Sequence, residues 1–174
     1  MSKPPMTTGL SNASLLDPRA GTVTGPVNIV IESGRIAQVS STPIGACDSV
    51  FDLDGATLMP GLCDAHVHVT AGTASFPDLL RWSPMYTTAR ASEILQGMLL
   101  RGFTTVRDCG GADYGLAKAI EEGYVTGPRL LFSGHAISQT GGHGDMRGPG
   151  ENWDNCTCCA GLGVVADGVS EVRR

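Results

Sequence analysis

After Pro60-Gly61 the sequence alternates between short apolar runs and longer segments that have helical periodicity. Each helical segment is followed by a glycine, the residue that commonly ends a helix. Repeated strand–helix units form a parallel sheet, and such a sheet needs cover on both faces. We therefore expect an α/β fold after residue 60. The expected strands are residues 62–69, 103–108 and 129–133, and the expected helices are residues 87–101 and 112–122.

The length of this region limits how much of a larger fold it can form. A complete (β/α)8 TIM-type barrel takes about 200 residues or more, and residues 60–174 supply about three of its strand–helix units. The segment from Ala166 begins as a helix would and stops at Arg174 without a cap. The pattern thus predicts the first three βα units of an incomplete barrel over residues 60–174.

Residues 9–59 have a different pattern, with short strands separated by turn signals. Residues 27–32 and 35–39 flank Ser33-Gly34, which is the spacing of a hairpin with a two-residue turn. Residues 50–55 alternate apolar and acidic side chains. We expect an accessory β-sandwich or open sheet over residues 9–59, preceded by a short disordered lead over residues 1–8.

The composition excludes several classes of partner. The 12 lysines and arginines are scattered in a chain of net charge −5, so no basic face is available for nucleic acid. No apolar run reaches the roughly 18 residues of a membrane span. The N-terminus lacks the apolar core of a secretory signal. These features favour a cytoplasmic protein without nucleic-acid or membrane partners.

Six cysteines in this context indicate reduced thiols rather than a disulfide framework. The isolated ones, expected to be small buried or half-buried side chains, are Cys47, Cys63 and Cys109. A second group could be a soft metal or redox site, or simply loop thiols, since its spacing is not that of a zinc knuckle. That group is Cys156, Cys158 and Cys159. It lies in a glycine-rich segment, residues 140–163, which predicts one long irregular loop.

The segment Pro60-Gly-Leu-Cys-Asp-Ala-His-Val-His-Val69 carries the most chemistry. Side chains alternate along a strand, so Asp64, His66 and His68 are expected on one face. Two imidazoles two residues apart can converge on one metal ion, which activates a bound water near neutral pH. Active sites of barrels lie at the C-terminal ends of the strands. The sequence therefore predicts a metal site at the end of this strand.

This segment resembles the first-strand motif of the amidohydrolase superfamily, Pro-Gly-hydrophobic-x-Asp-x-His-x-His. The resemblance starts near residue 20 and continues through residues 101–111, 127–130 and 140–145. It points to the imidazolonepropionase-like and Xaa-Pro-dipeptidase-like branch, which includes fungal ochratoxinase-type carboxypeptidases. It implies a metal-dependent hydrolase of amide or cyclic-amide C–N bonds, with Zn²⁺ as one or two divalent ions. A small amide or dipeptide-like substrate is implied, and a homo-oligomer in the full-length form is compatible with it.

By this resemblance His66 and His68 are metal ligands. Asp64 carries over as a shaping residue, hydrogen-bonded at the strand rather than bound to metal. His143 carries over as a substrate contact, with a solvated loop histidine as the alternative. Another histidine, His135, is expected to be structural.

At the end of the second strand, Asp108 has two interpretations. It either hydrogen-bonds in support of a metal-bound histidine or forms a strand-end ion pair with Arg107, and the ion pair is the simpler expectation.

Other parts of the family's site have no counterpart in this sequence. The resemblance implies a carboxylated lysine or a glutamate on the fourth barrel strand, histidines on the fifth and sixth, and an aspartate on the eighth. The two lysines, Lys3 and Lys118, both precede any fourth strand. We therefore predict no catalytic residue in this chain and expect a fragment without the full active site. The alternative is a catalytically dead binding or interaction module derived from the same fold.

Overall fold

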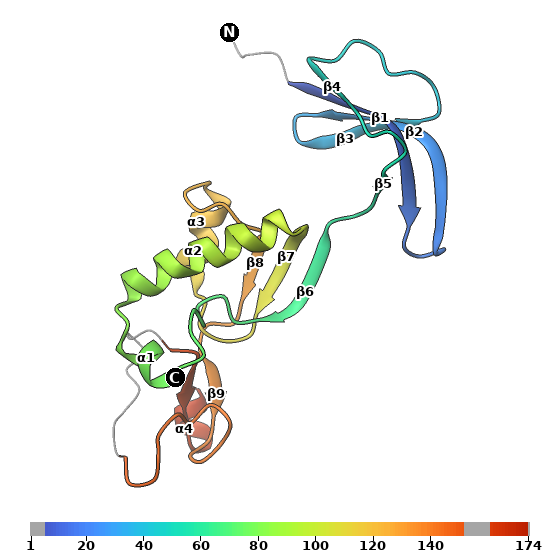
Figure 1. Cartoon of the computed structure of the whole chain (residues 1–174). Helices are drawn as coiled ribbons and strands as arrows, with labels where there is room; N and C mark the ends of the chain where they lie inside the picture. Colours follow the sequence, from blue (N-terminus) through green and yellow to red (C-terminus); the bar gives the residue numbers. More distant parts are fainter. Residues whose placement is uncertain (1–5, 152–160, 174) are drawn as a thin grey trace. The chain divides into compact units, whose positions relative to one another are not determined.

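The computed structural model describes residues 6–151 and 161–173. The chain forms two compact units, Met1–Pro60 and Gly61–Arg174 (Figure 1).

The first unit is a single mixed sheet. Its strands run in the order β3-β2-β1-β4, and β5 also pairs with β1. Neighbours β1, β2 and β3 are antiparallel, whereas β4 and β5 run parallel to β1. The described strands of this unit therefore form one open sheet, which is one of the two arrangements that the sequence predicts. The strands are β1 (Thr7–Asp17), β2 (Thr22–Glu32), β3 (Arg35–Ser40), β4 (Ser49–Asp52) and β5 (Thr57–Leu58).

The predicted hairpin is present between β2 and β3. Ser33 and Gly34 both have positive φ angles, 50° and 73°, as a two-residue type I′ turn requires. The turn sets the register, with Glu32 opposite Arg35 at the first pair of the hairpin.

The first strand begins at Thr7, inside the lead of residues 1–8 that the sequence predicts to be disordered. The amide and hydroxyl of Thr7 donate to Asp48 Oδ2 at 2.7 and 2.9 Å. These two bonds also lower the pKa of the Asp48 carboxyl, the backbone bond having the larger effect. The partner lies 41 residues away, so local sequence pattern gives no sign of it. Residues 1–5 lie outside the described part of the chain.

The second unit contains an open parallel sheet with strand order β6-β7-β8, and a small parallel pair, β9 and β10. The α/β class is therefore confirmed, and the described strands form no closed barrel. The strands are β6 (Leu62–Val67), β7 (Phe103–Asp108), β8 (Arg129–Phe132), β9 (Ala136–Ser138) and β10 (Gly163–Val165). The helices are α1 (Phe76–Arg81), α2 (Pro84–Leu100), α3 (Tyr114–Glu121) and α4 (Gly168–Val172).

Side-chain caps determine where the two crossover helices begin. Ser83 Oγ accepts a hydrogen bond from the Tyr86 amide at 3.2 Å, and Pro84 occupies the first turn of α2. Asp113 Oδ1 accepts from the Leu116 amide at 3.0 Å at the start of α3. Helix α2 therefore begins before the expected residue 87, and α3 begins after the expected residue 112.

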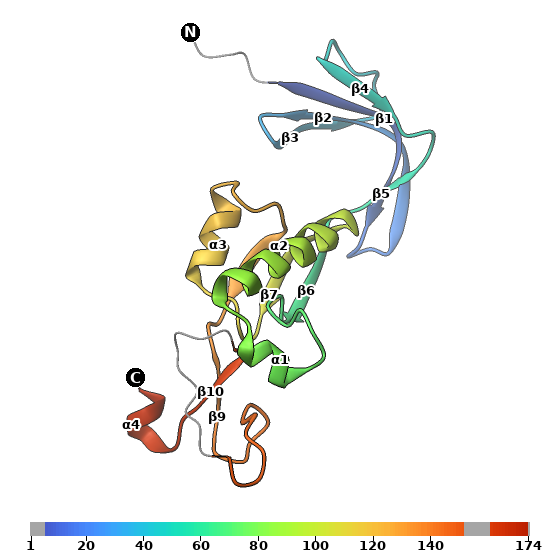
Figure 2. The same ribbon diagram turned by 60° about the vertical axis from the view of Figure 1, so that its left-hand side comes forward.

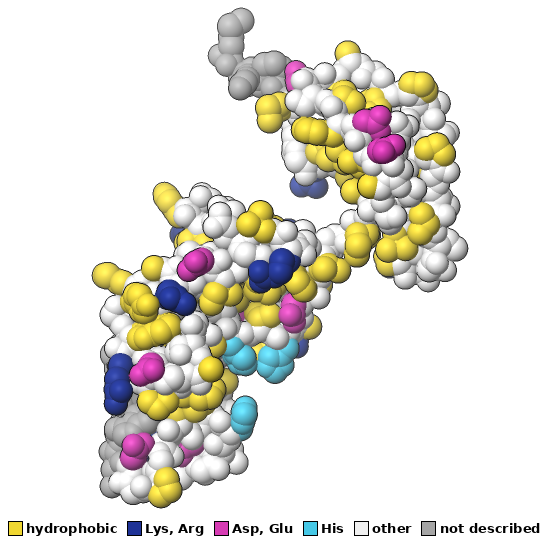
Figure 3. Space-filling model, in the orientation of Figure 1, with side chains coloured by type: hydrophobic (Ala, Val, Ile, Leu, Met, Phe, Trp, Pro, Cys, Tyr) yellow, Lys and Arg dark blue, Asp and Glu magenta, His cyan; other side chains and the backbone are white. Residues whose placement is uncertain are grey.

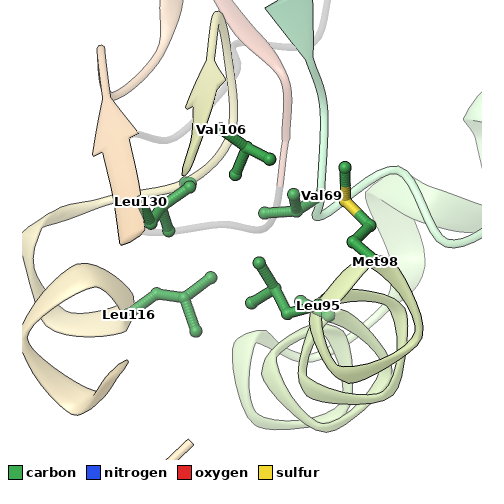
Figure 4. Packing of buried hydrophobic residues seen from close by; sticks show 8 residues of the cluster. Val69, Leu95, Met98, Val106, Leu116 and Leu130 are labelled. Atoms are coloured by element: carbon green, nitrogen blue, oxygen red, sulfur yellow. The ribbon is translucent and has the colours of Figure 1, made fainter. Parts of the chain in front are cut away.

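The core of this unit lies between the two helices and the sheet (Figure 4). Its fully buried centre is Leu95 on α2 and Val106 on β7, each 0% exposed. Figures 1 and 2 show α2 and α3 over the same side of the strands. The buried cluster comprises Val69, Ala91, Leu95, Met98, Val106, Ala112, Leu116 and Leu130.

The opposite face of the sheet is not covered by any described helix, contrary to the expected cover on both faces. Leu131 on β8, which alternates with the buried Leu130, is 51% exposed. Cys63, predicted to be buried or half-buried, is also exposed. The cause is the strand order: β6, β7 and β8 follow each other in one direction, and right-handed crossovers then place both helices on one side.

Two further elements differ from the predicted pattern. The predicted loop, residues 140–163, leads into β10, which begins at Gly163. This strand pairs in parallel with β9, which precedes the loop. Helix α1 was not predicted, because six residues are too few for a clear period. The cysteine cluster, Cys156, Cys158 and Cys159, lies outside the described residues. No helix among those described is long and apolar enough to span a membrane.

Candidate metal centre

The alternation of side chains along β6 is interrupted before the histidines. Asp64 pairs with Val106 and Val67 pairs with Asp108, so β6 has one more residue than β7 between these pairs. Such an insertion is a β-bulge. Because paired residues of parallel strands share a face, Asp64 lies on the face of Val106 and not on that of the histidines. Its Oδ1 accepts a hydrogen bond from the His66 amide at 3.1 Å.

The two histidines themselves are brought together, as the sequence predicts. They flank Val67, which packs against the helix-side core, and their ring centroids are 5.2 Å apart with an interplanar angle of 71°. His66 is exposed and His68 is half-buried. Figure 3 shows histidine side chains reaching the surface of this unit. Zinc–imidazole bonds are about 2.0–2.1 Å long, so this spacing allows both rings to approach one ion.

One nitrogen of His68 has a partner across the sheet. Its Nδ1 lies 2.9 Å from the carbonyl oxygen of Gly110, which follows β7. A carbonyl oxygen can only accept a hydrogen bond, so Nδ1 carries the proton and donates it. The lone pair of Nε2 is then available to bind a metal ion.

Asp108 is 0% exposed at the C-terminal end of β7. Its Oδ2 accepts from the Val69 amide at 2.7 Å, and its Oδ1 accepts from the amides of Gly110 and Ala112 at 2.9 and 3.1 Å. Arg107 instead donates its Nε hydrogen to the Ala65 carbonyl at 2.7 Å. The expected ion pair between Arg107 and Asp108 is therefore absent from the described residues, because the carboxylate is occupied by backbone amides.

The glycine-rich loop after β9 is held by carboxylates. Asp145 accepts two hydrogen bonds from the guanidinium of Arg147, at 2.7 and 2.8 Å, and one from the Gly141 amide at 2.8 Å. The arginine, and then the Gly141 amide, lower the pKa of the Asp145 carboxyl far below its ordinary value. Asp167, before α4, accepts from both the amide and the hydroxyl of Thr140.

The other two histidines are not part of this pair. His143 is exposed in the loop that follows β9, and His135 is half-buried just after β8. Over residues 6–151 and 161–173, no ring contact or hydrogen bond joins either of them to the paired histidines. Within the same residues, no group of three or more His, Cys, Asp or Glu side chains could hold a metal ion. His66 and His68 therefore fit as two ligands of a metal site, and the described residues supply no third.

Sequence reasoning missed Gly110 as the partner of His68. The only local sign is the Gly110-Gly111 pair, one residue after the end of β7. A glycine is needed at position 110 for a steric reason. A Cβ there would lie 2.5 Å from the Leu162 carbonyl oxygen and 3.4 Å from Cε1 of His68. A contact between residues 42 positions apart cannot be read from a single sequence.

Comparison with known proteins identifies the class to which this fold and histidine pair belong. A sequence profile of the Amidohydrolase family matches residues 57–172. The chain therefore belongs to the amidohydrolase family, and the resemblance seen in the sequence is confirmed.

Curated relatives and solved structures agree with this assignment. Ochratoxinase from Aspergillus niger is 37% identical over 130 residues, covering 67% of this chain and 27% of the ochratoxinase. Adenine deaminase from Mesorhizobium japonicum is 32% identical over 84 residues, covering 47% of this chain and 14% of the deaminase.

Among solved structures, a prolidase complexed with N-methylphosphonate-L-proline has a TM-score of 0.89 at 41% identity. That alignment covers 97% of this chain and 42% of the prolidase chain. The crystal structure of A. niger ochratoxinase has a TM-score of 0.76 at 30% identity, covering 98% of this chain and 43% of the other. The chain spans less than half the length of these relatives.

Proposed function

We propose that this chain forms the opening part of a metal-dependent amidohydrolase that hydrolyses C–N bonds of small amide or dipeptide-like substrates. The observation that carries the proposal is the pair His66 and His68, 5.2 Å apart at the C-terminal end of a parallel strand. Active sites of barrel enzymes lie at that end of the strands.

A divalent ion, Zn²⁺ in this proposal, would polarise the scissile carbonyl and activate a water molecule when bound. The chain's own contribution is to hold two imidazoles side by side. His68 is oriented through Nδ1, and His66 has its backbone amide held by Asp64. Catalytic zinc sites have three protein ligands, and residues 6–151 and 161–173 place no third ligand beside these two histidines. The third ligand and a general base would then come from outside the described residues.

The finer fold assignment is part of the same proposal. We assign β6, β7 and β8 as the first three strands of a (β/α)8 barrel, and residues 9–59 as the accessory β segment. The sequential parallel order and the TM-score of 0.89 to a prolidase support this. Under this assignment the uncovered face of the sheet, with Leu131 and Arg107, faces the barrel interior.

The substrate class is inferred from relatives. One solved neighbour is a prolidase bound to a phosphonate derivative of proline, and a curated relative is an ochratoxinase. These names favour amide or dipeptide-like substrates over the purines of the more distant deaminases. His143, in the loop that Asp145 and Arg147 shape, is proposed as a substrate contact. We propose a cytoplasmic location and a homo-oligomer for the full-length form.

The test is a zinc titration of the 174-residue chain combined with hydrolysis assays on N-acyl amino acids and dipeptides. With two histidine ligands, we expect weak zinc binding and no turnover. Binding is expected to be weaker still in His66→Ala/His68→Ala, and unchanged in the control His143→Ala. Tight stoichiometric zinc with turnover would show that the chain alone holds a complete site and would overturn this part of the proposal.

One observation favours the alternative of a non-catalytic interaction module. Among the described strands β8 pairs only with β7, so one edge of the sheet is open. Beside that edge, α3 and β8 line a groove of about 630 Å³ that includes Ile120, Leu130 and Phe132. An exposed edge of this kind is a site for pairing with another chain. A stable hetero-complex with no metal dependence would favour this second candidate.

A further inference from the structure

The buried carboxylate of Asp108 joins the ends of two neighbouring strands. Its Oδ2 binds the amide of Val69, the residue directly after His68, at 2.7 Å. Its Oδ1 binds the amides of Gly110 and Ala112 in the turn after β7. A buried carboxylate is costly unless its oxygens are hydrogen-bonded, and these amides provide that compensation. One side chain thus hydrogen-bonds both to the turn after β7 and to the residue that follows His68.

The peptide group between Gly110 and Gly111 is held at both ends. Its carbonyl accepts the hydrogen bond from Nδ1 of His68 at 2.9 Å. Its N–H, on Gly111, donates to the carbonyl of Gly134 after β8 at 2.9 Å. Hydrogen bonds in such a chain polarise and strengthen one another. The ends of all three strands, β6, β7 and β8, are therefore linked through this peptide.

Both glycines are required for this close packing. A Cβ on Gly111 would overlap the hydroxyl of Thr70, and its φ angle of 116° is unfavourable for any other residue. A Cβ on Gly110 would lie 2.5 Å from the carbonyl of Leu162. The turn has little room to move, and its carbonyl is presented to His68 at a fixed position.

We propose that Asp108 is a positioning residue that acts on His68 through the Gly110 carbonyl. By fixing the turn, it holds His68 in the tautomer with the proton on Nδ1 and keeps Nε2 free for a metal ion. The metal part of this inference rests on the proposed function, whereas the tautomer is a property of the metal-free chain. Loss of such a partner behind a metal-bound histidine typically lowers metal affinity about 10- to 100-fold.

The substitution Asp108→Asn tests this with little change in shape. It replaces one accepting oxygen by an NH₂ group that must face amide donors, so the turn loses at least one of its hydrogen bonds. The matched control is Asp113→Asn, at the exposed N-cap of α3, where asparagine serves equally well. The probe is long-range ¹H–¹⁵N NMR of the imidazoles in the metal-free 174-residue chain at about pH 8, where an ordinary histidine is neutral. His68 is assigned by His68→Gln.

In the wild type and in Asp113→Asn, His68 is expected to be almost wholly in the Nδ1–H tautomer. In Asp108→Asn the signal of that tautomer is expected to fall towards the mixture found for His143. A folded Asp108→Asn with an unchanged His68 tautomer would overturn the inference. If Asp108→Asn does not fold, the wild-type spectrum still tests the inference, because an Nε2–H tautomer of His68 in the wild type would overturn it.

A zinc titration of the same samples separates this inference from the proposed function. A tautomer change in Asp108→Asn together with no zinc response in any sample would overturn the proposed metal site and leave the positioning role intact. A zinc response of His68 that is equal in wild type and Asp108→Asn would contradict the positioning role and support the metal site.

Discussion

At Gly61 the chain passes so close to β7 that a Cβ built there would overlap the side chain of Thr104. The glycine of the Pro60-Gly61 motif thus has a steric reason: it lets the start of β6 approach its neighbour. Nearby, the amide of Leu62 donates to the Gly102 carbonyl at 2.8 Å, which depends on the same approach.

We predict that Gly61→Ala destabilises the second unit by about 1–3 kcal/mol, because the added methyl group forces β6 and β7 apart. Gly45→Ala is the control, since nothing lies within 4 Å of a Cβ at that position. Urea unfolding followed by circular dichroism measures both. Equal stability of the two variants would contradict the steric explanation.

Sequence reasoning placed the two histidines on one face because side chains alternate along a strand, and the preceding Pro-Gly-Leu-x-Asp supported the metal interpretation. For Asp64 it predicted the hydrogen bond at the strand, which is present, but not the face, since a bulge between Asp64 and Val67 changes the face to which the carboxylate belongs. It favoured the wrong partner for Asp108, because the amides that bind this carboxylate are brought to it by the tertiary structure.

At the scale of elements, strands and helices with strong periodicity were predicted from the sequence, and those defined by distant partners were not. The hairpin of β2 and β3 follows from Ser33-Gly34 alone. The start of β1 depends on Asp48, and β10 depends on pairing with β9 across a long loop. The conformation of the described part of the glycine-rich loop also depends on side-chain partners, because Asp145 and Asp167 hold it through hydrogen bonds.

The pKa of Asp145 is lowered in the folded chain, whereas an aspartate in an unfolded chain titrates at about 3.9. Its contribution to stability is therefore complete above about pH 4 and is lost as the pH falls through the lower folded pKa. We predict that Asp145→Asn lowers stability at about pH 7 and that its difference from wild type shrinks on acidification below about pH 4.

Urea unfolding at several pH values checks this prediction. The control is Asp78→Asn, which removes only an exposed contact with Arg81 at 3.8 Å and should change stability little at any pH. A difference between wild type and Asp145→Asn that stays constant down to the lowest pH would contradict the assigned role of the carboxylate.

At the scale of the whole molecule, the open edge of β8 and the uncovered face of its sheet are the main features. The sequence predicted the parallel α/β class and the incomplete set of strands, but not that both helices cover one face. That follows from the strand order, which depends on which strands pair. Leu131, at 51% exposure, is the most exposed large apolar side chain of this edge strand.

We predict that the chain self-associates with rising concentration and that Leu131→Lys shifts it towards the monomer, because a charged side chain blocks edge pairing. The control is Leu100→Lys, at a position on α2 that is 82% exposed and away from the edge. Size-exclusion chromatography with light scattering gives the masses. A wild-type chain that stays monomeric at every concentration would contradict this prediction.

The central claim is that His66 and His68 together form part of a metal site. The most direct measurement is imidazole ¹⁵N NMR of the 174-residue chain during a zinc titration, with all four histidines observed at once. We predict that the signals of His66 and His68 shift together at the same zinc concentration, while His135 and His143 do not respond. A zinc response confined to His135 or His143, or shifts of His66 and His68 at unrelated zinc concentrations, would contradict the claim.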